Sequence, residues 1–169
     1  MIKLMNIAII GHGGHGKDTV CEYLENNYDI QFVSSSMIAC NFFIFDALKY
    51  KYGYKTPYEC FMDRSNHRKE WADLIKNYIK DDLTLFGRLL FSRSPIYCGL
   101  RNIIELKALK DANIIKKVIW VDAIKRLPPE SKDSISITIN DADIIVDNNR
   151  SKENLYKNID LLIPFITEN

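Results

Sequence analysis

Short apolar runs alternate along this chain with segments of helical periodicity. Nearly uninterrupted apolar runs occur at residues 3–10, 30–33, 95–98, 118–121 and 142–146. Such runs are typical of strands buried on both faces of a parallel sheet. Between them, apolar residues recur at intervals of three and four, which predicts helices. The pattern therefore predicts a single α/β domain whose five parallel strands are joined by right-handed helical crossovers.

The longest interval, between the second and third apolar runs, predicts a block of helices at residues 37–52, 57–62, 69–79 and 82–91. Gly53 and Pro57 separate the first two helices, because glycine and proline interrupt helical segments. Further helices are expected at residues 16–26, 101–112 and 151–164, the last of them capped by Ser151. The chain is thus expected to carry a helical insert beside its sheet.

The segment that joins the first apolar run to the first helix reads Gly11-x-x-x-x-Gly16-Lys17. In a strand–loop–helix of this kind, successive backbone N–H groups point inward and cradle phosphate oxygens. The N-terminus of the helix adds a partial positive charge, and Lys17 supplies a mobile cation for terminal phosphates. The segment predicts a nucleoside triphosphate site with the candidate residues Gly11, Gly13, Gly14, His15, Gly16, Lys17, Asp18 and Thr19.

This loop departs from the common pattern after the lysine. A serine or threonine usually follows and places its hydroxyl on magnesium, whereas here Asp18 follows and the hydroxyl comes at Thr19. The competing interpretation is a glycine-rich turn in which Asp18 is simply a favourable acid in the first helical turn. His12 and His15 resemble metal ligands, but no cysteine or carboxylate cluster accompanies them, so they are expected to be solvated loop residues.

Several arginines are candidates for a second anion site. Arg64 and Arg68 lie four residues apart, and guanidinium groups bind phosphate bidentately. A solvated helix face is the alternative interpretation for that pair. Arg88 lies in the helix at 82–91 and joins the candidate set. Arg101 follows the third apolar run, where ligands bind at the carboxyl ends of parallel strands, and this position favours a functional role.

Two polar segments have ambiguous roles. The serines at 34–36, which include the substrate-binding candidates Ser35 and Ser36, could cap the next helix or contact a substrate at the mouth of the sheet. Residues 125–139 contain Lys125, Arg126 and two prolines and have little periodicity. They could close over a phosphate site as a lid that excludes water and adds cations, or form an ordinary long connection.

Composition narrows the function classes. The 169 residues are 47% hydrophobic and 27% charged, as expected of a soluble globular chain. A formal net charge of +1 gives no electrostatic case for binding nucleic acid or an anionic membrane. The four cysteines are widely spaced, and no signal peptide or membrane-spanning run is evident, so a cytoplasmic protein is expected. Oligomeric state is left open, a homodimer included.

Taken together, the segments resemble the deoxynucleoside monophosphate kinases of bacteriophages, within the P-loop nucleoside monophosphate kinase group. The resemblance spans nearly the whole chain and is carried by Gly-x-x-x-x-Gly-Lys-Asp-Thr, Asp63-Arg64, His67-Arg68, Tyr97-Cys98-Gly99-Leu100-Arg101, Trp120-Val121-Asp122-Ala123, Lys125-Arg126-Leu127-Pro128-Pro129-Glu130 and Asp141-Ala142-Asp143-Ile144-Ile145-Val146-Asp147-Asn148-Asn149. The phosphate loop specifies only the superfamily, and the later segments are more specific.

The resemblance implies a three-layer α/β/α kinase with sheet order 2-3-1-4-5. It implies a core at about 1–33, 92–124 and 140–169, an NMP-binding region at about 34–91 and a lid at about 125–139. ATP with Mg²⁺ would be the phosphoryl donor, and a deoxynucleoside 5′-monophosphate would be the acceptor. For a viral enzyme the location would be the host cytoplasm.

The resemblance also implies residue roles. Lys17 would hold donor phosphates, Lys125 and Arg126 would neutralise the transferring phosphoryl group, and the acceptor phosphate would contact Arg64, Arg68 and Arg101. Many kinases of this group carry an aspartate at the end of the third strand that organises magnesium through water, whereas this chain has Cys98-Gly99 there. Asp18 and Asp122 are the candidates to replace it.

The resulting hypothesis is phosphoryl transfer from ATP to a deoxynucleoside monophosphate, with Lys17, Arg101 and Arg126 as catalytic residues. Alternatives are a small P-loop kinase with another phosphorylated acceptor, such as dephospho-coenzyme A or phosphomevalonate, and a nucleotide-binding module without catalysis. A GTPase is disfavoured because neither an Asn-Lys-x-Asp nor an Asp-x-x-Gly switch motif is evident.

Overall fold

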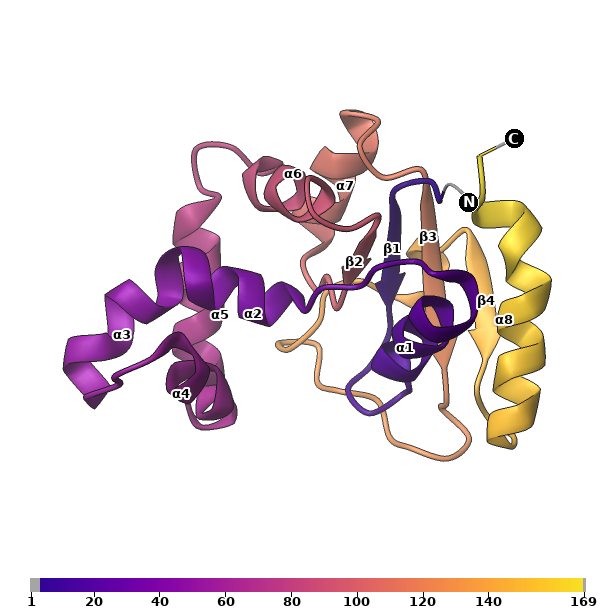
Figure 1. Ribbon diagram of the computed structural model, residues 1–169, viewed down its shortest axis with the longest axis horizontal. Coiled ribbons are helices and arrows are strands. Elements are labelled where there is room, and N and C mark those ends of the chain that lie inside the picture. The colour runs from indigo at the N-terminus through magenta and orange to yellow at the C-terminus, as the bar shows by residue number, and fades with distance from the viewer. Residues whose placement is uncertain (1–3, 169) are drawn as a thin grey trace.

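A parallel β-sheet forms the centre of the fold in the computed structural model, which describes residues 4–168. Within those residues the sheet has four strands: β1 (Ile7–Ile10), β2 (Ile96–Cys98), β3 (Lys117–Asp122) and β4 (Ile144–Asp147). Their order is β2-β1-β3-β4, so the first strand in sequence lies inside the sheet (Figure 1). All pairings are parallel, and the carboxyl ends of the strands therefore meet along one edge.

The prediction of five strands is wrong in one place. Residues 30–33 form no strand, and the observed order equals the predicted one with that edge strand removed. The backbone of this segment bonds elsewhere: Ile30 N donates to Leu24 O, Phe32 N donates to Glu25 Oε1, and Gln31 O accepts from the Ser94 hydroxyl. The first strand is also shorter than predicted, and Lys3 lies outside the described residues.

Two helices cover one face of the sheet. Alternate strand residues, among them Ile7, Ile9 and Ile119, are buried against α1 (Lys17–Tyr28) and α8 (Lys152–Ile166). Figure 1 shows these helices together on one side of the strands. Burying an isoleucine or leucine side chain contributes about 1.5–3 kcal/mol, so this continuous apolar layer fixes how α1 leaves the end of β1.

The opposite face is covered by α6 (Leu85–Phe91) and α7 (Ile103–Asp111). Ala8, Ile10 and Trp120 are buried on this side, in a cluster that includes residues of both helices. The strands are therefore buried from both sides, as their apolar runs predict. The arrangement is an α/β fold compatible with three α/β/α layers.

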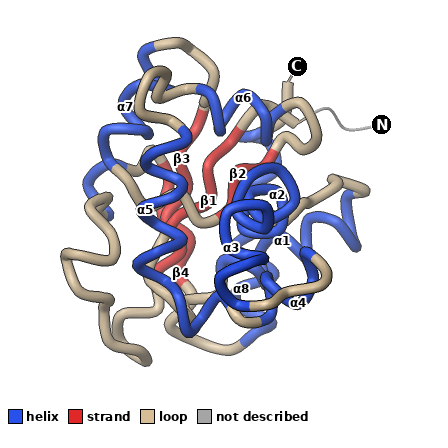
Figure 2. The backbone as a smooth tube through the Cα atoms, turned by 90° about the vertical axis from the view of Figure 1, so that its left-hand side faces the viewer, coloured by secondary structure: helices blue, strands red, loops and turns tan. Residues whose placement is uncertain are grey.

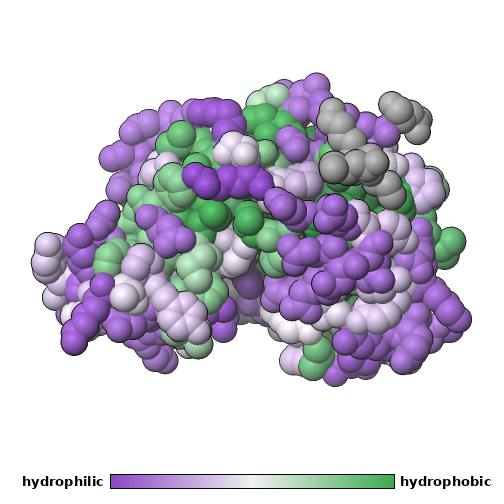
Figure 3. Space-filling model, viewed as in Figure 1, coloured by the Kyte–Doolittle hydropathy of each residue, from purple (hydrophilic) through white to green (hydrophobic). Residues whose placement is uncertain are grey.

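The helical insert lies to one side of the sheet and is continuous with this second apolar cluster. Figure 2 shows it in front of the strands, and Figure 3 shows an indented surface between it and the sheet. The insert consists of α2 (Ser35–Ala39), a π-helical turn (Cys40–Ile44), α3 (Phe45–Tyr52), α4 (Pro57–Met62), a 3-10 turn (Arg64–His67) and α5 (Arg68–Tyr78). The predicted helix at 37–52 is thus one run interrupted by a π-helical turn.

Local sequence signals set several helix ends. The Ser34 hydroxyl caps α2, the Thr56 hydroxyl caps α4, and the Ser151 hydroxyl caps α8, each accepting a backbone N–H three residues on. Gly53 ends α3 in the left-handed conformation, with φ of 74°. Among the described residues, no helix combines the length and the apolar character that a bilayer crossing requires.

One buried hydrogen bond between two titratable side chains connects β2 to α7. The Tyr97 hydroxyl donates to Glu105 Oε1 at 3.0 Å, and both side chains are buried. Burial raises the pKa of Glu105 from 4.5 to about 7, against the opposing effect of the Tyr97 hydrogen bond. The folded chain consequently holds a proton that the unfolded chain releases between these two pH values.

Because the folded-state pKa is the higher one, the free energy of unfolding should fall as pH rises from 4.5 to about 7, by up to about 3 kcal/mol. Glu105→Gln stays neutral and can still accept the Tyr97 hydrogen bond. We expect it to match the wild type at pH 4.5 and to be more stable at pH 8, as measured by urea unfolding.

Glu22→Gln is the matched control, because Glu22 is exposed on α1. It should leave the pH dependence of unfolding unchanged. An equal pH dependence in the wild type and in Glu105→Gln would show that Glu105 does not hold the extra proton.

Candidate functional site

The glycine loop, residues 11–17, leaves the carboxyl end of β1 and enters α1. Gly11 has φ of 144°, and a Cβ there would lie 2.6 Å from Val121 O. Gly16, the residue before α1, has φ of 98°, and a Cβ there would collide with the side-chain amide of Asn148. Only glycine therefore suits these two positions, where the loop passes close to β3 and to the segment after β4.

Buried polar contacts hold the loop from behind. Asn148 Nδ2 donates to His15 O at 2.8 Å, and His15 Nδ1 accepts from Ala123 N at 3.1 Å. Both side chains are buried. The expectation that His15 is solvated is wrong: its ring is inaccessible and connects the loop to the end of β3. His12 is half-buried, and its Nδ1 accepts from Glu130 N at 3.2 Å.

Lys17 is folded back onto its own loop. Its Nζ donates to Gly11 O at 2.9 Å and to His12 O at 2.7 Å. The residue is 9% exposed, and burial lowers the pKa of the ammonium group. Lys17 is thus positioned within the loop as a desolvated cation that can exchange two carbonyl partners for anionic oxygens.

The start of α1 offers further donors. The first bond of this helix runs from Val20 N to Gly16 O, so the N–H groups of residues 17–19 have no partner within the helix. Together with Gly13 N and the Lys17 ammonium, they give the loop the donor set of an anion site. Asp18 is exposed here and Thr19 is half-exposed, both in the first turn of the helix.

A carboxylate from the segment after β3 enters this donor set. Glu130 Oε2 accepts from Gly13 N at 2.6 Å, and both Glu130 oxygens lie 2.9 Å from Arg101 Nη1. The absence of a Cβ on Gly13 permits this approach, since one would lie 3.2 Å from Glu130 Cδ. Burial would raise the pKa of Glu130, but Arg101, Gly13 N–H and Lys17 together lower it, so the group is ionised at neutral pH.

Arg101 is brought to the loop, as its position after β2 predicts. Gly99, with φ of 85°, turns the chain at the end of β2, and Gly99 N donates to Ile9 O at 2.9 Å. Arg101 follows as a half-exposed residue just before Asn102, which caps α7. Through the Glu130 carboxylate, the guanidinium and the glycine loop contact a common group.

Other candidates at this edge have partners of their own. Arg126 Nε donates to Asn148 O at 2.7 Å, which places Arg126 beside the residue that supports the loop. Lys125 N donates to Asn149 Oδ1, and Asp122 Oδ2 accepts from Asn149 Nδ2 at 3.0 Å. The Asp-Asn-Asn segment at the end of β4 thus organises the turn after β3.

The structure does not bring the remaining arginines to the glycine loop. Arg64 donates to Phe61 O and stacks on the Phe61 ring, with its guanidinium carbon 4.0 Å from the centroid. Arg88 Nη2 lies 2.7 Å from Asp82 Oδ2, which precedes the start of α6. Arg68 is exposed at the start of α5 and lines a shallow depression of the insert. Arg64 and Arg68 belong to the helical insert and Arg88 to α6, and the contacts of Arg64 and Arg88 are local.

The three serines have different surroundings. Ser34 caps α2, whereas Ser35 Oγ donates to Cys98 O at 2.9 Å and lies next to Gly99. Ser35 therefore reaches the mouth of the sheet from the insert. Ser36 is half-buried in the first turn of α2.

The segment 125–139 is anchored in its second half. Ile135 and Ile137 are buried in the core cluster beside α7, and Ser136 exchanges hydrogen bonds with Arg101 O and Ile103 N. Every residue from 124 to 134 except Glu130 is exposed. Any movement over the loop therefore belongs to residues 124–134 rather than to the whole predicted lid.

The described residues contain no group of three or more histidine, cysteine or acidic side chains arranged to hold a metal. Asp18 Oδ1 accepts a weak hydrogen bond from Cys98 Sγ at 3.6 Å, so the residue at the end of β2 and the acid after Lys17 are neighbours. Asp122 lies at the end of β3, in contact with Asn149. Both predicted magnesium candidates thus lie at the carboxyl edge of the sheet.

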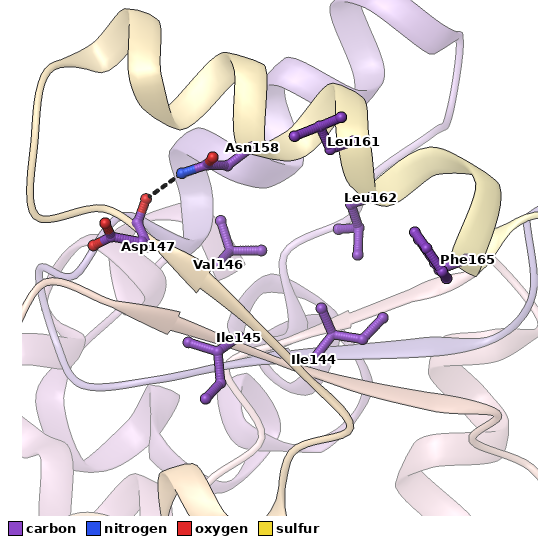
Figure 4. Close-up of a pocket in the computed structure, with 8 residues that line it drawn as sticks. All are labelled: Ile144, Ile145, Val146, Asp147, Asn158, Leu161, Leu162 and Phe165. Atoms are coloured by element: carbon purple, nitrogen blue, oxygen red, sulfur yellow. Dashed lines mark hydrogen bonds between the residues drawn. The ribbon is translucent and has the colours of Figure 1, made fainter.

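A second concavity lies away from the loop, between β4 and α8 (Figure 4). It has a volume of about 250 Å³ and is lined mainly by apolar side chains, including the exposed Ile145, Leu161 and Phe165. No residue of the glycine loop lines it.

The sequence alone indicated no individual role for Glu130 or Asn148, and it did not predict that the His15 ring is buried. Glu130 and Asn148 appear only within longer segments of the family resemblance. No local periodicity marks them, because the contacts that connect them to the glycine loop span more than 100 residues of the chain.

Gly16→Ala should disable the glycine loop, because the new Cβ would displace Asn148. Gly53→Ala is the matched control: Gly53 also has positive φ, at 74°, but nothing lies within 4 Å of the position that a methyl group would take there. We expect Gly53→Ala to cost only the backbone strain, about 1–2 kcal/mol. Gly16→Ala should cost about 3 kcal/mol, since the Asn148 hydrogen bond is lost as well.

Thermal unfolding of both variants measures this difference, and titration with ATP measures the consequence for the loop. If the loop binds ATP, as its sequence predicts, the affinity should fall in Gly16→Ala and stay at the wild-type value in Gly53→Ala. Equal effects of the two variants on stability and affinity would contradict the assigned role of Asn148.

Comparison with protein-family models finds none that matches this chain, and comparison with curated proteins finds no match either.

Proposed function

We propose that this chain is an ATP-dependent kinase that transfers a phosphoryl group to a deoxynucleoside 5′-monophosphate and releases ADP. The observation that carries the proposal is the meeting of Gly13 N–H and the Arg101 guanidinium on one carboxylate, with Lys17 in the same loop. A carboxylate and a phosphoryl group accept the same donors at similar distances. A backbone N–H of the loop and a guanidinium from another element thus converge on one anion, and the Lys17 ammonium lies on the same loop.

The chemistry asks for alignment and charge neutralisation rather than for a strong base. An acceptor phosphate oxygen is already nucleophilic at neutral pH and attacks the γ-phosphorus of ATP in line, while the bond to the ADP oxygen breaks. Backbone N–H groups of residues 13–19 would hold the donor phosphates. Lys17 and Arg101 would offset the charge on the equatorial oxygens of the transferring group.

The acceptor is assigned from the resemblance to phage deoxynucleoside monophosphate kinases, and its place is the indentation between the insert and the sheet (Figure 3). Ser35, which reaches Cys98 O from the insert, would lie at that acceptor side. Arg64 and Arg68 could join only if the insert moved toward the loop, and Arg88, in α6, only if it released Asp82. Nucleoside monophosphate kinases close in this manner around their substrates.

Bound magnesium would supply positive charge that offsets the negative charge of the donor phosphates. The oxygen donors near the loop are suited to a hard cation: the Asp18 carboxylate and the Thr19 hydroxyl belong to the first turn of α1. Cys98 replaces a carboxylate at the end of β2, and its contact with Asp18 places that acid beside the substituted position.

The direct test is ADP release with a panel of acceptors: dAMP, dGMP, dCMP, dTMP, their ribose counterparts, dephospho-coenzyme A and phosphomevalonate. We expect turnover with at least one deoxynucleoside monophosphate. Lys17→Ala and Arg101→Ala should each lower the rate by a few hundredfold, about 3–4 kcal/mol of transition-state stabilisation.

Lys107→Ala is the control for charge removal, because Lys107 is exposed on α7. It should retain the wild-type rate. Turnover of another phosphorylated acceptor alone would refute the substrate assignment, and ATP binding without any turnover would identify a binding module.

Asp18→Asn should change the magnesium dependence of turnover. If Asp18 orients the ion through bound water, the magnesium concentration at half-maximal rate should rise by about tenfold or more. The affinity for ATP measured without magnesium should not fall, since the variant removes a negative charge beside the phosphates.

Asp122→Asn is the comparison variant, because Asp122 is the other acid at this edge. A shift in Asp122→Asn with none in Asp18→Asn would assign the magnesium role to the end of β3 instead.

A further inference from the structure

The Glu130 carboxylate occupies the anion site of the glycine loop. It accepts from Gly13 N at 2.6 Å and from Arg101 Nη1 at 2.9 Å, and Glu130 N donates to His12 Nδ1 at 3.2 Å. Its side chain is 17% exposed. The carboxylate therefore engages Gly13 N–H and the arginine beside the loop, and the Glu130 backbone adds a contact to His12.

The surrounding chain indicates that this contact is specific. Within the segment 124–134 Glu130 alone is not exposed, and its carboxylate is the group that this segment places on Gly13 N–H and Arg101. The segment 124–134 is fixed at both ends, by buried Ala123 after β3 and by Ile135 in the core. Release of Glu130 thus requires a local movement of an exposed loop and leaves the core intact.

The contact is incompatible with a bound polyphosphate. A phosphate oxygen on Gly13 N–H would need the position of Glu130 Oε2, and a second anion there would repel the carboxylate. Arg101 Nη1 cannot serve an acceptor phosphate while both Glu130 oxygens lie 2.9 Å from it. Ligand binding and the Glu130 contact consequently exclude each other.

We propose that Glu130 is an internal anionic plug: its carboxylate fills the phosphate site of the empty loop, and the triphosphate of an incoming nucleotide displaces it. The inference rests on the proposed function for the identity of that nucleotide. It adds that displacement frees Arg101, so binding of the donor prepares the site for the acceptor phosphate.

The plug has two quantitative consequences. First, the apparent affinity for a polyphosphate equals the intrinsic affinity multiplied by the fraction of molecules with Glu130 released, so removing the plug should tighten binding by about tenfold. Secondly, the donor should raise the affinity for the acceptor in the wild type. Binding of the donor displaces Glu130 from Arg101, so the acceptor no longer has to do so. The coupling should weaken when the carboxylate is removed.

The test uses the full chain with Glu130→Gln, Glu130→Ala and the control Asp133→Asn. The control removes one negative charge from an exposed position of the same segment, residues 124–134. ATP and inorganic triphosphate are titrated by calorimetry in the absence of magnesium, and the Gly13 amide resonance is followed by NMR. We expect both Glu130 variants to bind each probe about tenfold more tightly and Asp133→Asn to resemble the wild type.

In the ligand-free chain, the Gly13 amide resonance should move in both Glu130 variants and stay in place in Asp133→Asn, which tests the contact itself without any ligand. Weaker binding in both Glu130 variants would overturn the proposal and make Glu130 a ligand-contacting group. Unchanged binding, or no binding of either probe to any variant, would overturn it as well. Inorganic triphosphate that binds more tightly to the variants while ATP binds to none would support the plug and refute the proposed nucleotide function.

Discussion

The close approach of the glycine loop to β3 and to the segment after β4 is the constraint on which this site depends. Backbone N–H groups can serve an anion only if the loop is held in one conformation, and loops seldom have that rigidity by themselves. Here Asn148 and His15 hold the loop from its buried side. Asn148 Nδ2 donates to His15 O at 2.8 Å, and His15 Nδ1 accepts from Ala123 N at 3.1 Å. Gly16 leaves the space that Asn148 occupies, so one missing methyl group permits the whole arrangement.

The parallel sheet determines which groups can act together at that loop. All four described strands end along one edge, and each carboxyl end supplies a different part of the site. These parts are the glycine loop after β1, Arg101 after β2, the segment with Glu130 after β3 and Asn148 after β4. Because Arg101 and the loop share the Glu130 carboxylate, electrostatic coupling between the two elements exists before any ligand is present. In the proposed kinase, that same pair would separate to accept two phosphates in line.

The sequence predicted the parts of this molecule that depend on local order and failed where distant residues decide. The apolar runs at β1 to β4, the caps at Ser34 and Ser151 and the position of Arg101 follow from periodicity and neighbouring residues. The segment 30–33 has the pattern of a strand, but its backbone bonds to Leu24, Glu25 and Ser94 instead of β2. His15 lies in a short polar loop, where a solvated side chain is expected. It is instead buried beside Ala123 and Asn148, and no local sequence pattern indicates this burial.

The most direct test of the proposed site is a crystal structure of the chain with a non-hydrolysable ATP analogue, Mg²⁺ and the best deoxynucleoside monophosphate from the panel. We predict that a donor phosphate oxygen lies on Gly13 N–H where Glu130 Oε2 now lies, at 2.6 Å. We also predict that Arg101 contacts phosphate and that Glu130 has left. An analogue bound elsewhere, with the Glu130 contacts to Gly13 and Arg101 intact, would contradict both the proposed site and its displacement by the donor.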